Sequence, residues 1–263
     1  MNSYIPKVAK IIDLIKHTEK EWTFRVECDT KNVLPGKFFE ISMPKYGESP
    51  ISVSGYGEDY IDFTIRNVGK VTSEIFKYEV GDSLLIRGPY GNGFNLEKYI
   101  GRELTVVAGG SALAPVRGIV EYVYQNPNKF NNFNLIVGFR TINDALFKDD
   151  LKRWTEKLNV IVTVDKETEG YDGFVGLVTK YIPDLKIEDV DNFSCAVVGP
   201  PMMMKFTVGE FLKRNIAEEN IWVSYERKMC CGLGKCGHCK MDESYICLDG
   251  PVYDYSKAKT LID

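Results

Sequence analysis

The chain has 263 residues, of which 44% are hydrophobic and 12% aromatic, which is enough apolar material for about two globular domains. Its formal net charge of −4 and its pI near 5.5 argue against nucleic acid or an anionic membrane as a partner. The N-terminus alternates apolar with charged residues, and no stretch reaches about 18 unbroken apolar residues. We therefore expect a cytoplasmic protein with neither a nucleic-acid nor a membrane partner.

Short β segments with turn residues between them fill residues 6 to 97. The turns contain Leu34-Pro35-Gly36, Gly55-Tyr56-Gly57 and Val80-Gly81-Asp82. The strands are predicted at Val8 to Leu14, Trp22 to Cys28, Phe38 to Met43, Ile51 to Ser54, Tyr60 to Arg66 and Ser83 to Arg87. Because six candidate strands follow one another so closely, the sequence predicts a six-stranded antiparallel barrel.

From about Gly101 the pattern changes to strand, glycine turn and helix. Leu104 to Ala108 is a continuous apolar run, which is typical of a buried parallel strand. Further strands are predicted at Asn134 to Phe139, Val160 to Asp165 and Cys195 to Val198, and helices through Tyr124, at Ala145 to Leu158, at Leu177 to Ile182 and at Met202 to Asn215. This alternation predicts a doubly wound α/β domain around a parallel sheet, with Pro115 early in its first helix.

Two glycine turns in this region indicate a nucleotide site. Gly109, Gly110, Ser111 and Ala112 follow the first parallel strand, and Gly199, Pro200, Pro201 and Met202 follow another. Small residues let a phosphate approach the backbone N–H groups and the positive end of the next helix. The alternative is that such turns only allow close packing of strand and helix. Two turns at the same edge of one sheet favour the nucleotide site.

Five of the seven cysteines lie between Met229 and Pro251. Four of them, Cys231, Cys236, Cys239 and Cys247, have the C-x4-C-x2-C-x7-C spacing typical of a plant-type [2Fe–2S] cluster. Glycines between the ligands supply the repeated turns that a small cluster needs. Cys230 would leave five intervening residues and is expected to point away. A zinc knuckle or a disulfide knot is the alternative, although zinc sites usually contain two C-x-x-C pairs and this stretch has one.

Several motifs in this order resemble the ferredoxin–NADP reductase superfamily: RGPYGNGF at 87 to 94, AGGSALAPVRG at 108 to 118, VGPPMMM at 198 to 204 and the closing cysteines. The chain resembles the branch that holds the electron-transfer subunit of dihydroorotate dehydrogenase. Its endings, ERKMCCGLGKCGHCKMDESYICLDGPVYDYSKAK and VVGPPMMMKFT, further resemble the NADH-oxidising flavoprotein subunits of anaerobic sulfite reductases. The resemblance covers nearly the whole chain.

The resemblance implies a barrel that binds FAD, an α/β domain that binds NAD(P)H as substrate, and a [2Fe–2S] cluster. A nicotinamide gives up two electrons as a hydride and a cluster accepts one, so a flavin stands between them. By family position Pro50, Ile51 and Ser52 border the isoalloxazine. Thr64, Ile65 and Arg66 line the flavin, and Gly69, Val71, Thr72 and Ser73 face its pyrophosphate.

The chain departs from the family motif at Ser49, where relatives carry an arginine that neutralises flavin phosphate. Either Arg66 replaces it or the pyrophosphate relies on backbone amides, so FMN stays an alternative to FAD. Without the family, Ser49 to Ser52 would be an ordinary strand start. In the α/β domain the resemblance adds Arg140 near the ribose or phosphates, with a solvated charge as the alternative. Asp165 either meets a ribose hydroxyl or caps a turn, and these residues do not choose NADH over NADPH.

The implied partners are iron–sulfur and siroheme-containing subunits of a sulfite reductase. Within the same class the alternatives are the electron-transfer subunit of dihydroorotate dehydrogenase or of a hydrogenase. A zinc-stapled nucleotide-binding module is the non-redox alternative. We expect a flavin-binding barrel at 1–98, an NAD(P)-binding domain at 99–224 and a cluster module at 225–263. Arg227, Lys228, Lys235 and Lys240 form a basic rim on which the partner is expected to dock, with Asp242 and Glu243 on the far side of the third ligand, Cys239. A solvated rim without a docking role is the alternative.

Overall fold

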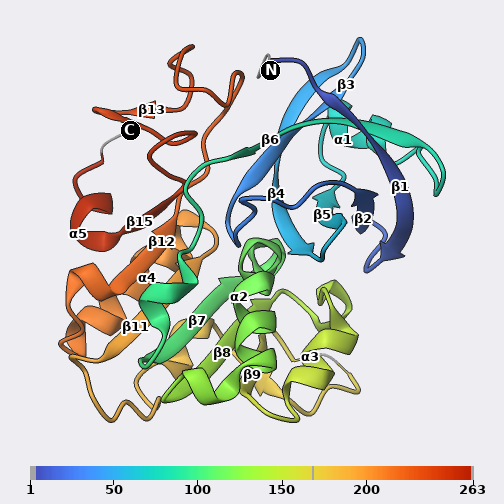
Figure 1. Ribbon diagram of the computed structural model, residues 1–263. Coiled ribbons are helices and arrows are strands. Elements are labelled where there is room, and N and C mark those ends of the chain that lie inside the picture. The colour runs from blue at the N-terminus through green and yellow to red at the C-terminus, as the bar shows by residue number, and fades with distance from the viewer. Residues whose placement is uncertain (1–3, 168, 262–263) are drawn as a thin grey trace. The chain divides into compact units, whose positions relative to one another are not determined.

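The computed structural model describes residues 4–167 and 169–261, which form two compact units (Figure 1). The barrel unit takes in the described residues up to Phe94 together with Tyr225–Val252. The α/β unit takes in Asn95–Ser224 and Tyr253–Thr260. The cysteine-rich stretch 229–251, called the cluster loop below, thus belongs to the barrel unit. The three domains expected at 1–98, 99–224 and 225–263 stay a prediction.

The barrel unit contains a closed barrel of six strands in the order β1-β2-β5-β4-β3-β6. All neighbouring strands are antiparallel, which confirms the predicted barrel. The strands are β1 (Lys7–Lys16), β2 (Glu21–Glu27), β3 (Phe38–Met43), β4 (Gly47–Tyr56), β5 (Tyr60–Arg66) and β6 (Ser83–Tyr90). The short helix α1 (Lys70–Ile75) was not predicted. The cluster loop adds a small hairpin of β13 (Lys240–Met241) and β14 (Ser244–Tyr245).

The side chains of β3 alternate between the inside and the outside of the barrel. Phe39, Ile41 and Met43 lie in its apolar core. Because successive side chains of a strand point to opposite faces, Phe38 and Glu40 lie on the outer face. Both are nevertheless buried, at 3% and 0% exposure. The outer face of β3 is therefore covered, and a carboxyl group is enclosed there.

The α/β unit is built on a seven-stranded sheet in the order β10-β9-β8-β7-β11-β12-β15. The pairs from β10 to β12 are all parallel, which confirms the predicted parallel sheet. The strands are β7 (Glu103–Gly109), β8 (Asn132–Phe139), β9 (Asn159–Val164), β10 (Phe174–Val175), β11 (Phe193–Val198), β12 (Ile221–Ser224) and β15 (Val252–Asp254). Strand β11, between β7 and β12, is buried at every position, as expected for a parallel strand inside the sheet.

The helices of the α/β unit differ from the prediction at two places. They are α2 (Leu113–Gln125), α3 (Lys148–Trp154), α4 (Pro201–Lys213) and α5 (Tyr255–Ala258). The helix predicted at Ala145 to Leu158 is shorter because Phe147 has a left-handed backbone, with φ 54°, directly before α3. The segment predicted as a helix at Leu177 to Ile182 is a 3-10 turn at Val178–Tyr181. Other 3-10 turns lie at Leu96–Tyr99, Gly110–Ala112, Pro127–Lys129, Ile142–Asp144 and Glu218–Asn220.

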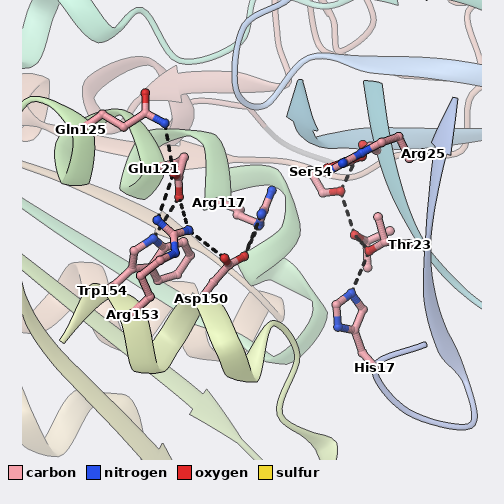
Figure 2. A network of polar contacts seen from close by, with 12 residues as sticks. His17, Thr23, Arg25, Ser54, Arg117, Glu121, Gln125, Asp150, Arg153 and Trp154 are labelled. Carbon is pink, nitrogen blue, oxygen red and sulfur yellow. Dashed lines mark hydrogen bonds and ion pairs between the residues drawn. The ribbon is translucent and has the colours of Figure 1, made fainter. Parts of the chain in front are cut away.

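A polar network joins α2 to α3. Figure 2 shows Glu121 on α2 facing Arg153 and Trp154 on α3, and its carboxylate accepts from both, at 2.8 and 3.0 Å. Asp150 accepts from Arg153 and from Arg117, each at 2.7 Å. Burial alone would raise the pKa of Glu121, but the bonds from Arg153 and Trp154 outweigh it and lower that pKa. The network therefore holds α3 against α2 with charged groups that all have partners.

Glu121→Ala is expected to lower the free energy of unfolding by about 1–3 kcal/mol. The substitution leaves the indole N–H of Trp154, a fully buried residue, without its acceptor. Urea unfolding of the two proteins measures the difference. The matched control is Glu210→Ala on α4, whose partner Lys213 is 71% exposed, so its loss should cost less than about 0.5 kcal/mol. Equal losses in both variants would contradict a special role for the α2–α3 network.

Candidate cofactor sites

The cluster loop folds back on itself so that its amides face cysteine sulfurs. Leu233 and Lys235 donate backbone N–H groups to Cys231 Sγ at 3.3 and 3.4 Å, and Gly234 donates to Cys247 Sγ at 3.1 Å. Gly232, Gly234 and Gly237 all have left-handed φ values, between 65° and 80°, as the predicted repeated turns require. The loop thus directs backbone N–H groups at the sulfurs of two predicted cluster ligands.

The four predicted ligands lie near one another. The His238 backbone lowers the pKa of the Cys236 thiol, and the Cys231 side chain acts in the same direction. Burial raises the pKa of Cys247 to about 12, and Cys239 and Cys231 add to the shift. Cys231 therefore lies near both Cys236 and Cys247, and Cys239 lies near Cys247.

A two-iron cluster takes four protein ligands, two on each iron. Within residues 4–167 and 169–261, no group of three His, Cys, Asp or Glu side chains is arranged to hold a metal ion, so the fit to a [2Fe–2S] cluster rests on the four thiols and their plant-type spacing. Cys230 is exposed, whereas Cys231 is 9% exposed and receives the two amide bonds. The contacts favour Cys231 as the first ligand.

A polar cluster on the outer barrel face was missed by sequence reasoning. Arg87 on β6 binds Glu48 on β4 through Nε at 2.8 Å, and Glu40 pairs with Arg87 in the register of β3 and β6. Neither carboxylate oxygen of Glu40 has a hydrogen-bond partner among the described residues. Burial raises the pKa of Glu40 to about 7, and Arg87 acts against the shift. The only sequence signal was a charged residue, Arg87, inside the RGPYGNGF motif.

The residues predicted to border the flavin ring lie on two adjacent barrel strands. Pro50, Ile51 and Ser52 are half-buried on β4. Thr64, on the neighbouring strand β5, donates to Ser54 at 2.7 Å. The Ile65 side chain is fully buried in the barrel core, so only its backbone can face a ligand. That these residues border the flavin ring stays a proposal. The residues whose side chains could do so are Pro50, Ser52 and Thr64.

A directional hydrogen-bond chain ends beside Ser54. Thr64 donates to Ser54, and Ser54 donates to the Asp62 carbonyl at 3.0 Å, so both hydroxyl protons are engaged. Thr23, 2.7 Å from Thr64, must then donate to it, and His17 Nε2 must donate to Thr23 at 2.8 Å (Figure 2). His17 is therefore assigned the tautomer that carries its proton on Nε2. The proton of the Thr64 hydroxyl is thus already used. A ligand beside Thr64 could only donate a hydrogen bond to this hydroxyl.

The predicted pyrophosphate segment surrounds the start of α1, with Gly69 as its N-cap. The Thr72 hydroxyl already accepts from the Val68 and Gly69 amides and donates to the Gly69 carbonyl, and Ser73 donates to Asn67. The donors left for a phosphate are backbone amides of the first helical turn, including Val71. Arg66 pairs with Glu21 at 3.1 Å. The contacts favour backbone amides, rather than Arg66, in place of the family arginine.

The predicted nucleotide residues meet at the carboxyl ends of four parallel strands. Gly109 pairs with Gly138 across β7 and β8, and Val198 pairs with Ala108 across β11 and β7. The Asp165 amide donates to the Phe139 carbonyl at 3.0 Å, which places Asp165 beside the end of β8. The turns at 109–112 and 199–202, Arg140 and Asp165 therefore share one edge. Pro115 lies in the first turn of α2, half-buried.

Met203, which was not predicted, fills the space between the two glycine turns. A Cβ built on Gly199 would lie 2.5 Å from Met203 Cε, and one built on Gly109 would lie 2.5 Å from Met203 Sδ. The predicted Met202 is instead 59% exposed. A Cβ at either turn would therefore displace the flexible end of Met203, so glycine allows the close packing seen here. This packing is compatible with a nucleotide site and does not by itself demand one.

Two lysines of the basic rim have contacts within the barrel unit. The ammonium group of Lys240 lies 3.8 Å from the Glu243 carboxylate. Lys235 lies over the Tyr4 ring at 5.5 Å. The docking role of the rim stays a prediction.

The closed antiparallel barrel, the parallel α/β sheet and the ferredoxin-like cysteine loop together define the ferredoxin–NADP reductase class of electron-transfer protein. Residues 106–209 match the model of the oxidoreductase NAD-binding domain, and residues 226–259 match the iron–sulfur cluster binding domain of dihydroorotate dehydrogenase B. The chain belongs to the family of NAD(H)-dependent flavin and iron–sulfur oxidoreductase subunits that includes sulfhydrogenase gamma subunits and dihydroorotate dehydrogenase B electron-transfer subunits. FAD, an iron–sulfur cluster and NADH, the predicted cofactors and substrate, are thereby confirmed.

Individual relatives match along most of the chain. Sulfhydrogenase 1 subunit gamma of Pyrococcus furiosus is 34% identical, over 95% of this chain and 89% of its own. The dihydroorotate dehydrogenase B (NAD(+)) electron transfer subunit of Clostridium perfringens is 31% identical, over 97% of each chain. A solved NADH-dependent reduced ferredoxin–NADP oxidoreductase aligns with a TM-score of 0.76 and 28% identity, over 95% of this chain and 91% of that one. None of the helices in the described chain is long and apolar enough to cross a membrane.

Proposed function

We propose that this subunit oxidises NADH by hydride transfer to FAD and passes single electrons through a [2Fe–2S] cluster to a partner subunit. The observation that supports the proposal best is that Cys231, Cys236, Cys239 and Cys247 have the plant-type spacing and lie in the segment that matches the iron–sulfur domain, in a chain of this family. When bound, the flavin accepts two electrons together and releases them one at a time. The thiolates hold the acceptor of those electrons on the barrel unit.

The protein's part in the hydride step is binding and orientation. The glycine turns at 109–112 and 199–202 offer backbone N–H groups to the dinucleotide phosphates, and Arg140 and Asp165 are proposed to meet phosphate and ribose. On the barrel, Pro50 and Ser52 would hold the flavin ring, and backbone amides of the first turn of α1 would bind its pyrophosphate. Direct hydride transfer from a nicotinamide to a flavin would need no side chain acting as a general acid or base.

Gly199→Ala is expected to raise the KM for NADH about tenfold, while flavin and iron contents stay unchanged. The new methyl group would meet Met203 and push it toward the Gly109 turn, where the phosphates are proposed to bind. Steady-state NADH oxidation with ferricyanide as acceptor measures the change. The matched control is Gly209→Ala within α4, where an added Cβ meets nothing within 4 Å. An unchanged KM in Gly199→Ala would contradict a nucleotide site at these turns.

For the partner we propose an anaerobic sulfite reductase assembly, in which further iron–sulfur and siroheme subunits reduce sulfite to sulfide. The likeness of VGPPMMM and of the cluster loop to flavoprotein subunits of those enzymes supports it. A hydrogenase is the second candidate, since two sulfhydrogenase gamma subunits of Pyrococcus furiosus are 34% and 35% identical to this chain.

Isolation of the native complex by an affinity tag on this chain tests the partner. The sulfite reductase proposal expects co-purified siroheme and NADH-dependent sulfide formation from sulfite. Hydrogen-dependent NAD reduction with nickel in the complex would favour the hydrogenase. NADH-linked oxidation or reduction of dihydroorotate and orotate would instead place the chain in a dihydroorotate dehydrogenase.

A further inference from the structure

The RGPYGNGF motif at 87–94 contacts both ends of the cluster loop, a role that the proposed function leaves unexplained. At its start, Arg87 donates to the carbonyl oxygens of Cys231 and Cys230, at 2.5 and 2.9 Å. Further along, the Gly91 amide donates to the Cys247 carbonyl at 3.2 Å. One short segment of the barrel therefore holds the backbone of the first and of the last cysteine ligand.

The Arg87 guanidinium uses all of its donors. Arginine has five N–H groups, and five bonds run from Arg87: two to Glu48, two to the cysteine carbonyls and one to the Tyr90 hydroxyl. Its side chain is only 4% exposed. A buried cation is stable only when it is paired and fully hydrogen-bonded. The groups around Arg87 therefore match a guanidinium at this position. Lysine, with three donors on one nitrogen, cannot make the same set of bonds.

The other end of the motif also makes close contacts with the cluster loop. Asn92 donates its side-chain amide to the Asp249 and Val252 carbonyls, at 2.9 and 2.6 Å, and accepts from the Val252 amide at 3.1 Å. Gly91 has φ 76°, and a Cβ there would lie 2.9 Å from the Gly250 carbonyl oxygen. The motif is thus shaped for close contact with the cluster loop.

Glu48 extends this contact to the strand proposed to border the flavin. It lies on β4, two residues before Pro50, and its carboxylate receives both Nε and Nη2 of Arg87. Residues 48, 50 and 52 share one face of the strand because side chains alternate. A continuous path of covalent and hydrogen bonds therefore runs from β4 through Glu48 and Arg87 to the backbone of Cys231.

We propose that Arg87 is the positioning residue that fixes the first cluster ligand, Cys231, against strand β4, and so sets the rate at which electrons pass from flavin to cluster. The inference rests on the proposed function, which gives the direction of electron flow from flavin to cluster. The bonds of Arg87 hold the ligand's backbone in place. This effect acts on the cluster and leaves the hydride step unaffected.

Arg87→Lys and Arg87→Gln test the proposal in the anaerobically purified full chain. Stopped-flow absorbance should show flavin reduction by NADH within about twofold of the wild type, while reduction of the cluster slows by on the order of tenfold or more. The EPR spectrum of the dithionite-reduced cluster should change in both variants, because the ligand moves. Tyr90→Phe, which removes only one acceptor at 3.1 Å, should have a small effect on both measurements.

The matched control is Arg25→Lys on the same barrel. Arg25 also makes a two-bond pair, with Asp62 at 2.7 and 3.0 Å, and both bonds join β2 to β5 within the barrel. Arg25→Lys should leave the cluster's EPR spectrum and both rates unchanged. Loss of iron from Arg87→Gln with an unchanged thermal unfolding midpoint of the barrel would also support the proposal.

Unchanged EPR spectra and rates in both Arg87 variants would overturn the proposal. An equal slowing of both steps in Arg87→Lys and Arg25→Lys would overturn it as well, since it would indicate general damage to the barrel. If dithionite reduces the cluster of the wild type and NADH does not, this result would contradict the proposed function but not the role proposed for Arg87. The EPR comparison of the variants would still decide the role of Arg87.

Discussion

Serine in place of Cys231, Cys236, Cys239 or Cys247 is expected to abolish the EPR signal of the reduced cluster, whereas Cys230→Ser keeps it. The four residues lie near one another, and Cys231 and Cys247 receive backbone amides at their sulfurs. Removing one thiolate leaves one iron with a single good protein ligand. Iron and acid-labile sulfide contents should fall together with the signal, by about tenfold or more.

Cys230 is the built-in control for this series. It lies next to Cys231, is exposed and contributes its carbonyl oxygen to Arg87. Serine keeps that backbone bond, so Cys230→Ser should fold and bind FAD like the wild type. Loss of the signal in Cys230→Ser together with its retention in Cys231→Ser would reverse the assignment of the first ligand. Stoichiometric zinc in the purified wild type, without iron, would contradict the cluster altogether.

Glu40→Gln is expected to raise the free energy of unfolding above pH 7, by about 3 kcal/mol at most. Burial raises the pKa of Glu40 from 4.5 to about 7, and Glu48 and Cys231 add to the shift. Between these two pH values the folded protein keeps the proton and the unfolded chain loses it. The wild type therefore loses stability as pH rises from about 4.5 to 7, and the glutamine variant does not.

Urea unfolding at a series of pH values measures this difference. The control is Glu58→Gln, at an exposed position on the same barrel unit, which should follow the wild type at every pH. The difference between Glu40→Gln and wild type should vanish at low pH, where both carry an uncharged side chain. A constant difference across the pH range would mean that the effect comes from packing and not from the proton on Glu40.

Local patterns predicted much of the fold. Strands β3 and β5 have the bounds that alternation of apolar residues indicated, and the apolar runs of the α/β unit became parallel strands. The helix at Ala145 to Leu158 was too long because the chain turns at Phe147 with a left-handed backbone. A bulky residue rarely adopts that conformation, and here the surrounding fold requires it. Periodicity carries no information about such a turn.

In the candidate sites, too, features within short stretches of sequence could be predicted, and contacts between distant segments could not. Ligand spacing and glycine turns lie within short stretches, so the cysteines and the nucleotide turns could be predicted. Arg87 and the carbonyl of Cys231 are 144 residues apart, and Glu48 lies on yet another strand. Their contact depends on strand register and on the path of the cluster loop. Met203 was missed because its place between the two glycine turns depends on the packing of α4 against β11.

The central claim is that electrons from NADH reach the cluster within this one chain. The most direct measurement is anaerobic titration of the purified subunit with NADH, followed by optical absorbance and by EPR of samples frozen at each step. We expect the flavin to lose its absorbance and the EPR signal of a reduced [2Fe–2S] cluster to appear without any partner. Flavin reduction by NADH with a cluster that stays oxidised, while dithionite reduces it readily, would contradict the account.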